Sequence, residues 1–216
     1  MTKSIYDINI KSWDGQEDFL AQFRDKVVLM TNTTADCGNA PQFGIIEEIY
    51  RKYKDQGFEV IAIPTNQYCG KGVTYGSWEN GIVTAEDSKK YAEDTYDVTY
   101  NFSEILVSKP GPGAPKGLKD GEVPHELFEE LVEQTDNTLM YGNFEKYLIG
   151  RDGQVIRKYP NGSLLDYAVN AGVPDAKSEY ERMCSDIEAA LANEITPRRH
   201  LHDEYPEIAK LSPSSK

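Results

Sequence analysis

The sequence predicts an α/β protein with a central mixed β-sheet flanked by helices. Val27–Met30 is a short apolar run of the kind found in strands buried on both faces, and Phe58–Ile63 is a second such run. Between them, apolar residues recur at three- and four-residue spacing over Pro41–Gln56, which indicates an amphipathic helix. A strand, a helix and a strand of this length form a right-handed βαβ unit with parallel strands. A hairpin within Asn143–Tyr159 adds antiparallel strands.

The residues before and around this unit are also patterned. Ile5–Ile10 alternates apolar and polar residues, which predicts a half-exposed strand closed by a turn at Ser12–Gly15. Pro41 suits the first turn of the following helix, and Gly57 suits its C-terminal cap.

The second half of the chain predicts three more helices and further strands. Gly-rich residues at 69–81 and the Pro- and Gly-rich stretch Lys109–Glu122 are typical of loops. The predicted elements are a helix at Thr84–Asp94, a short strand at Tyr96–Phe102, a helix at His125–Gln134, hairpin strands at Phe144–Ile149 and Val155–Tyr159, and a last helix at Ala176–Ala192.

Length and charge limit the classes of protein to consider. The 216 residues suit one domain, which we expect at 1–195, with a polar C-terminal tail at 196–216. The formal net charge of -13 disfavours nucleic acid and anionic membranes as partners, because both require basic patches. No apolar run approaches the roughly 20 residues of a membrane span, and the first residues do not resemble a signal peptide. These observations favour a cytoplasmic protein.

The chain has 3 cysteines, an odd number without zinc-type spacing. In a reducing cytoplasm they would be catalytic or sensing rather than disulfide-bonded. Cys184 falls on the apolar stripe of the last predicted helix, so we interpret it as a core residue. His200 and His202 lie in the polar tail and are typical of solvated residues, so no metal site is expected.

Cys37 is the candidate nucleophile. It lies between the strand Val27–Met30 and the helix that begins near Pro41. Unpaired backbone N–H groups and the positive end of the helix dipole stabilise a thiolate there and lower the thiol pKa. The alternative is that Cys37 is a small buried residue that fills a gap.

Two amide-bearing segments accompany this cysteine. An Asn-Gln pair, Asn66 and Gln67, follows the second parallel strand, and Asn143 opens the late hairpin. Loops after parallel strands gather at the carboxyl edge of a sheet, so we expect the pair to lie at the same edge as Cys37. A thiolate that attacks a peroxide needs polar donors to stabilise the charge on the departing oxygen, and neutral amides suit that task.

Three motifs resemble the glutathione peroxidase family, whose fold is thioredoxin-like, over roughly Ser4 to Tyr159. N-T-T-A-D-C-G at Asn32–Gly38 resembles the family's N-V-A-S-x-C/U-G. E-I-Y-R-K-Y-K-D-Q-G-F-E-V-I-A-I-P-T-N-Q-Y resembles L-Y-x-K-Y-K-D-x-G-F-E-I-L-x-F-P-x-N-Q-F. G-N-F-E-K-Y-L-I-G-R-D-G-Q-V-I-R-K-Y resembles W-N-F-x-K-F-L-V-x-x-D-G-x-V-x-x-R-Y.

The resemblance implies catalytic roles for three residues. Cys37 would be the peroxidatic nucleophile, with Gln67 and Asn143 polarising its sulfur. No bound cofactor is implied, because a thiol such as glutathione or thioredoxin serves as co-substrate. The family's tryptophan before the asparagine is replaced by Gly142, and the neighbouring Tyr141 is interpreted as a packing residue.

The resemblance also bears on regeneration and assembly. The family positions that hold a resolving cysteine are Ala92 and Thr65 here, which leaves Cys69 as the candidate resolving residue. An equally open alternative is that Cys69 has no role. Longer members use the region that matches Lys109–Glu122 for subunit contacts, so a homo-oligomer is plausible.

The leading hypothesis is a thiol-dependent peroxidase that reduces hydrogen peroxide or organic hydroperoxides and serves an antioxidant role in oxidative stress. One alternative is a peroxide sensor or redox-interaction protein of the same fold with weak turnover. Another is a thioredoxin-like enzyme that uses Cys37 for other sulfur chemistry.

Overall fold

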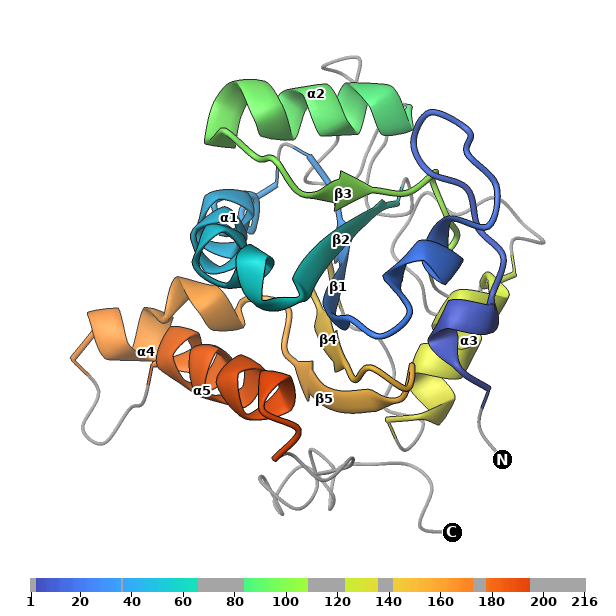
Figure 1. The fold of residues 1–216 in the computed structure, drawn as a ribbon. Helices are drawn as coiled ribbons and strands as arrows, with labels where there is room; N and C mark the ends of the chain where they lie inside the picture. The colour runs from blue at the N-terminus through green and yellow to red at the C-terminus, as the bar shows by residue number, and fades with distance from the viewer. Residues whose placement is uncertain are drawn as a thin grey trace, which may run out of the picture.

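The protein is described here by a computed structural model in which a five-stranded sheet has helices on both faces (Figure 1). The described residues are 3–35, 37–65, 84–108, 123–135, 142–172 and 178–194. The strands are β1 (Val27–Thr33), β2 (Phe58–Pro64), β3 (Asn101–Phe102), β4 (Lys146–Ile149) and β5 (Val155–Tyr159).

The sheet is mixed, as the sequence predicts. Its order is β3-β2-β1-β4-β5. β1 pairs parallel with β2, and β2 pairs parallel with β3. β4 runs antiparallel to both β1 and β5. The βαβ unit and the hairpin are therefore both confirmed, and they meet at β1 in the centre of the sheet.

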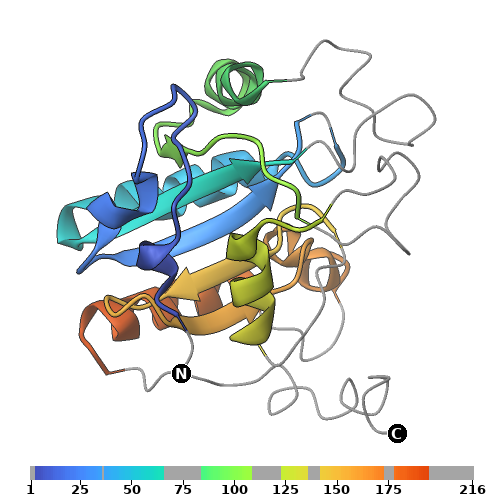
Figure 2. The ribbon, with the colours of Figure 1, turned by 90° about the vertical axis from the view of Figure 1, so that its right-hand side faces the viewer.

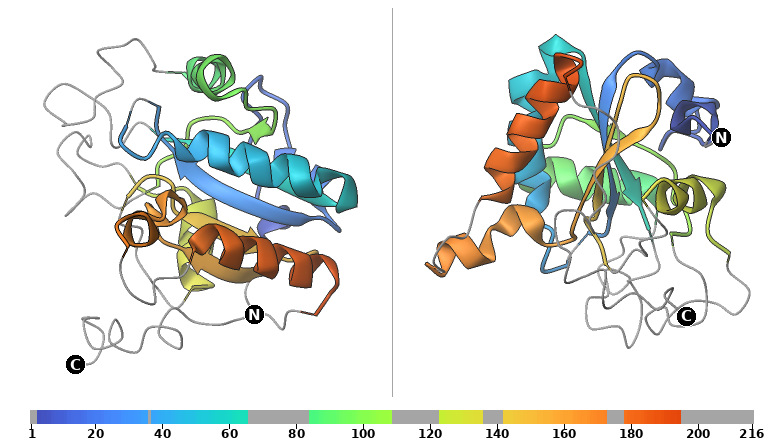
Figure 3. Two further views of the ribbon diagram at one scale, coloured as in Figure 1. Left: turned by 90° about the vertical axis from the view of Figure 1, so that its left-hand side faces the viewer. Right: turned by 90° about the horizontal axis from the view of Figure 1, so that it is seen from below.

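The helices cover both faces of this sheet. Figure 3 shows α1 and α5 side by side on one face, and Figure 2 shows α3 and the N-terminal segment on the other. The helices are α1 (Gln42–Tyr53), α2 (Ala85–Tyr96), α3 (Glu126–Glu133), α4 (Tyr167–Asn170) and α5 (Glu179–Leu191), with 3₁₀ turns η1 (Ile5–Asp7), η2 (Phe19–Phe23), η3 (Lys54–Gln56) and η5 (Ser163–Leu165).

Two apolar cores lie on the two faces of the sheet. Alternate residues of β1 point to opposite faces, so Leu29 packs with α1 and α5 while Met30 packs with the N-terminal segment and α3. Every residue of β1 is buried, which explains its continuous apolar run. Cys184 on α5 is buried in the first of these cores, as predicted.

The prediction of a strand at Ile5–Ile10 is wrong. Ile5–Asp7 forms η1, and the apolar side chains of this segment are buried against the sheet instead of pairing with it. Tyr6 fixes the segment by donating its hydroxyl hydrogen bond to the backbone oxygens of Lys26, at 2.8 Å, and Gly150, at 3.0 Å. The alternating apolar residues of this segment are therefore buried in the core without forming a strand of the sheet.

The boundaries of two other strands were also mispredicted. The predicted strand Tyr96–Phe102 is shortened to β3, because α2 continues through Tyr96 and Asp97 ends it in the left-handed conformation at φ 55°. The first hairpin strand begins at Lys146 rather than at Phe144. The predicted loops at 69–81 and 109–122 and the tail at 196–216 lie outside the described residues.

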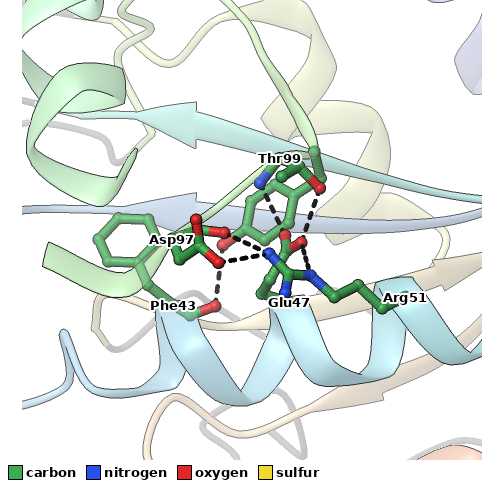
Figure 4. A network of polar contacts seen from close by, with 6 residues as sticks. Phe43, Glu47, Arg51, Asp97 and Thr99 are labelled. Carbon is green, nitrogen blue, oxygen red and sulfur yellow. Dashed lines mark hydrogen bonds and ion pairs between the residues drawn. The ribbon is translucent and has the colours of Figure 1, made fainter. Parts of the chain in front are cut away.

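A polar network joins α1 to the segment between α2 and β3 (Figure 4). Glu47, only 3% exposed, accepts hydrogen bonds from the backbone N of Thr99 at 2.8 Å and from Arg51 Nε at 2.6 Å. Arg51 also donates to the backbone oxygen of Asp97 at 2.8 Å. The buried carboxylate is thereby paired, which offsets the cost of removing it from water.

Candidate active site

Cys37 lies in a series of tight turns between β1 and α1. The backbone N of Ala40 donates to the Cys37 oxygen at 2.9 Å, and the N of Gln42 donates to Asn39 O at 3.0 Å. We call residues 37–41 the Cys37 turn. Cys37 is partly exposed, unlike the buried Cys184, and it packs against the edge of the core on the α1 face. The position between strand and helix is as predicted, and partial exposure is what a reactive thiol requires.

Asn143 lies in a buried turn, Gly142–Glu145, that precedes β4 and that we call the Asn143 turn. Asn32 near the end of β1 holds this turn. Its Nδ2 donates to Gly142 O at 2.9 Å, its Oδ1 accepts from Glu145 N at 3.0 Å, and its backbone O accepts from Phe144 N at 2.6 Å. Asn32 is the first residue of the cysteine motif, but nothing in the local sequence marks it as the residue that holds the turn before β4.

The two turns meet at the carboxyl edge of β1. Asn39 Nδ2 in the Cys37 turn donates a long hydrogen bond, 3.4 Å, to the backbone oxygen of Asn143. Figure 2 shows the segment after β1 and the start of β4 at this same edge of the sheet. Asn143 is 7% exposed, and its Oδ1 has no hydrogen-bond partner among the described residues. A buried amide oxygen without a partner costs about 1–3 kcal/mol, so a donor at this point would be favourable.

Gln42, Lys146 and Asn161 form a polar floor beneath the two turns. The fully buried Gln42 donates through Nε2 to Asn161 O at 2.7 Å and accepts through Oε1 from Lys146 Nζ at 2.7 Å. Lys146 also donates to Asn161 O at 3.2 Å. Burial lowers the pKa of Lys146 to about 7, an effect that nearby Glu145 and Glu179 partly oppose. Polar residues at otherwise apolar positions were the only sequence signal for this floor.

A buried ion pair holds the Asn143 turn from the opposite face. Lys158 Nζ lies 2.7 Å from Glu145 Oε2, and both side chains are almost fully buried. Glu145 Oε1 accepts from the backbone N of Gly142 at 3.3 Å. Burial lowers the pKa of Lys158, while Glu145 acts in the other direction. The ion pair thus fixes the backbone on either side of Asn143.

The structure describes only part of the predicted site. Cys37 and Asn143 are brought to one edge of the sheet, whereas Gln67, Cys69 and Tyr141 lie outside the described residues. Within the described ranges, no group of three or more His, Cys, Asp or Glu side chains could hold a metal ion. The same ranges contain no helix long and apolar enough to cross a membrane.

Solved structures support the thioredoxin-like fold. A crystal structure titled "Trgpx in apo form" superposes with a TM-score of 0.57 at 23% identity, covering 91% of this chain and 99% of that one. A thioredoxin-family thiol:disulfide interchange protein from Chlorobium tepidum superposes with a TM-score of 0.51 at 12% identity, covering 85% and 92%. These likenesses show the thioredoxin-like fold, and in this chain the partly exposed Cys37 follows the central strand β1 of that fold.

Sequence comparison is more specific. The glutathione peroxidase family model matches residues 5–109. The chain is 30% identical over 160 residues to a glutathione peroxidase of Lactococcus lactis, covering 72% of this chain and 88% of that protein. It is also 30% identical to a glutathione peroxidase-like peroxiredoxin of Schizosaccharomyces pombe (76% and 94% covered) and to a hydroperoxy fatty acid reductase of Synechocystis (72% and 86%). The chain belongs to the glutathione peroxidase family, and its class is that of a thiol-dependent peroxidase.

Proposed function

We propose that Cys37 is the peroxidatic residue of this peroxidase, that Asn143 and Gln67 polarise its sulfur, and that the substrates are hydrogen peroxide and organic hydroperoxides. The observation that carries the proposal is that the Cys37 turn is hydrogen-bonded to the turn that presents the buried amide of Asn143. The role of Gln67 rests on the family motif alone. A relative named hydroperoxy fatty acid reductase supports organic hydroperoxides as substrates.

The proposed reaction begins with attack of the Cys37 thiolate on one oxygen of the peroxide. A sulfur–oxygen bond forms, the oxygen–oxygen bond breaks, and the departing oxygen takes up a proton to leave as water or an alcohol. Cys37 is oxidised to sulfenic acid, and the peroxide is reduced. Amide hydrogens near the sulfur stabilise the charge that develops on the departing oxygen.

Asn143 Oδ1 has no hydrogen-bond partner within the described part of the chain, and this supports a substrate position beside Cys37. A hydroperoxide carries an O–H donor, and a hydrogen bond from this group to Oδ1 would give the buried oxygen a partner. The same bond would orient the peroxide for in-line attack by the sulfur.

For regeneration, we propose an external thiol, either glutathione or a thioredoxin, in a reducing cytoplasm. One thiol condenses with the sulfenic acid to give a mixed disulfide and water, and a second thiol releases the reduced enzyme and the oxidised disulfide. Cys69 is the internal alternative. Mass spectrometry after one equivalent of peroxide distinguishes the two routes, because a Cys37–Cys69 disulfide forms only if Cys69 resolves the intermediate.

A second candidate function is a peroxide sensor of the same fold with weak turnover. Gly142 favours it, because the residue before Asn143 lacks the side chain that the family motif has at this position. Fast oxidation of Cys37 without multiple turnover would support the sensor.

The test is stopped-flow consumption of peroxide by the reduced protein, with and without glutathione or a thioredoxin system. We expect Cys37→Ser to abolish consumption, and we expect the matched control Cys184→Ala, which removes a buried thiol, to leave it unchanged. Consumption that survives in Cys37→Ser would refute the assignment of the nucleophile. Unchanged kinetics in Asn143→Ala would refute the role of that amide.

A further inference from the structure

Gly142 and Asn161 compete for the same space beside Asn143. A methyl group added to the Gly142 α-carbon would overlap Asn161 Nδ2 and would lie 3.2 Å from Cγ and 3.4 Å from Cβ of Asn161. The backbone of Gly142 does not adopt a positive φ, so an alanine there would be strained only by this overlap. The carboxamide of Asn161 therefore fills the volume that a side chain at position 142 would occupy.

Three hydrogen bonds hold Asn161 in this position. Its Oδ1 accepts from the backbone N of Gly162 at 2.9 Å. Its backbone O accepts from Gln42 Nε2 at 2.7 Å and from Lys146 Nζ at 3.2 Å, and both of these donors belong to fully buried side chains. The two bonds to the backbone O hold the main chain of Asn161 against Gln42 and Lys146, and the bond to Gly162 N orients its carboxamide toward Gly142.

A chain of contacts links Asn161 to both the Cys37 turn and the Asn143 turn. Gln42 donates to the backbone O of both Asn161 and Asn39, and Asn39 donates to the backbone O of Asn143. The Asn161 carboxamide completes the path by packing against Gly142, which is bonded to Asn143. The Cys37 turn and the Asn143 turn are therefore connected through Asn161 as well as directly.

We propose that Asn161 is a positioning residue of the peroxidatic site, whose carboxamide packs into the space left by Gly142 and sets the placement of the Asn143 amide relative to Cys37. Asn161 lies outside all three motifs that identify the family. The proposal rests on the proposed roles of Cys37 and Asn143, and it explains what occupies the space beside Asn143 although residue 142 has no side chain.

The first experiment is a double-mutant cycle between positions 142 and 161, read as the rate constant for oxidation of Cys37 by hydrogen peroxide. We expect Gly142→Ala and Asn161→Ala each to lower it by about tenfold or more, since small misplacements of catalytic groups cost up to about 100-fold. Alanine at 161 retains only the Cβ, so it leaves room for a methyl group at 142. The double variant should therefore be no slower than the slower single variant. Multiplied effects, or an unchanged rate in Asn161→Ala, would overturn the proposal.

The second experiment asks whether Asn161 acts through Asn143. In an Asn143→Ala background, Asn161→Ala should have no further effect on the oxidation rate. A further decrease of about tenfold would mean that Asn161 acts independently, which would overturn the proposal. Thermal unfolding of each variant identifies any loss of folded protein. A merely structural effect lowers the melting temperature, but it leaves unchanged the ratio of the rate constant for Cys37 oxidation by peroxide to that for Cys37 alkylation by iodoacetamide.

The alkylation of Cys37 by iodoacetamide as a function of pH gives a readout that does not need peroxide. Asn161→Ala should shift the pKa of the Cys37 thiol in the same direction as Asn143→Ala. If the wild-type protein fails to consume peroxide, the proposed function is refuted while this profile still tests the positioning role. If peroxide consumption is rapid and the two variants shift the profile in opposite directions, only the positioning role is refuted.

Discussion

Replacing Lys146 with methionine tests whether the polar floor is electrostatically costly. The ammonium of Lys146 is fully buried, and among the residues that the structure describes its hydrogen-bond acceptors are the neutral Gln42 Oε1 and Asn161 O. Burial lowers its pKa from 10.5 to about 7 in the folded protein. The unfolded chain therefore binds more protons than the folded one between about pH 7 and about pH 10.5, and stability rises with pH across this window.

The magnitude follows from the two pKa values. Each pH unit within the window is worth about 1.4 kcal/mol, so between about pH 7.5 and about pH 9.5 the stability contributed by Lys146 should increase by about 2–3 kcal/mol. Lys146→Met removes this titration. The free energy of unfolding of the wild type, minus that of the variant, should rise by this amount over the same interval.

Guanidinium-induced unfolding of both proteins at several pH values measures the difference directly. Lys158, whose pKa is also lowered by burial, is present in both proteins and cancels. The control is Lys90→Met, because Lys90 is exposed and its hydrogen bond to Asp94 raises its pKa, so it keeps its charge across the window. A difference between wild type and Lys146→Met that does not change with pH would refute the reasoning.

Three further substitutions have defined outcomes. Asn32→Ala removes two buried hydrogen bonds to the Asn143 turn, so it should lower the free energy of unfolding by about 2–5 kcal/mol and slow peroxide consumption. The control Asn101→Ala also loses two hydrogen bonds but should leave peroxide consumption unchanged. Equal rates of peroxide consumption in the two variants would contradict this prediction. Glu47→Ala should lower the free energy of unfolding by about 2 kcal/mol, since the backbone N of Thr99 and two other donors lose a charged acceptor. A free energy of unfolding equal to that of the wild type would argue against this role of Glu47. Asp25→Gly should raise the free energy of unfolding by about 1 kcal/mol, because the exposed Asp25 has φ 65°, and a decrease would be inconsistent with backbone strain there.

The sequence predicted the long periodic segments closely, whereas it mispredicted a short alternating one. Long periodic segments were predicted closely: the helix at Pro41–Gln56 corresponds to α1 and η3, and the apolar run Phe58–Ile63 corresponds to β2. Ile5–Ile10 was mispredicted because its apolar residues are buried by docking on the sheet and not by pairing with a strand. Burial is visible in a local pattern, but the identity of the partner is not.

The candidate site shows the same division. The position of Cys37 between a strand and a helix was evident from the sequence, and so was the family. The contacts that support Asn143 join residues far apart in the chain: Asn32 to Gly142, Gln42 to Asn161, and Lys146 to Gln42. No local pattern marks such pairs, so their roles were missed.

The amino-acid sequence by itself determined the helix α1, the two buried strands of the parallel βαβ unit and the position of Cys37 after the first of them, because the pattern of each lies within one short stretch of chain. Only the tertiary structure decided which polar side chains surround the Asn143 turn and that Asn161 fills the space beside Gly142. The physical reason is that burial makes each of these polar groups depend on a partner that the folded sheet brings close and the chain keeps distant.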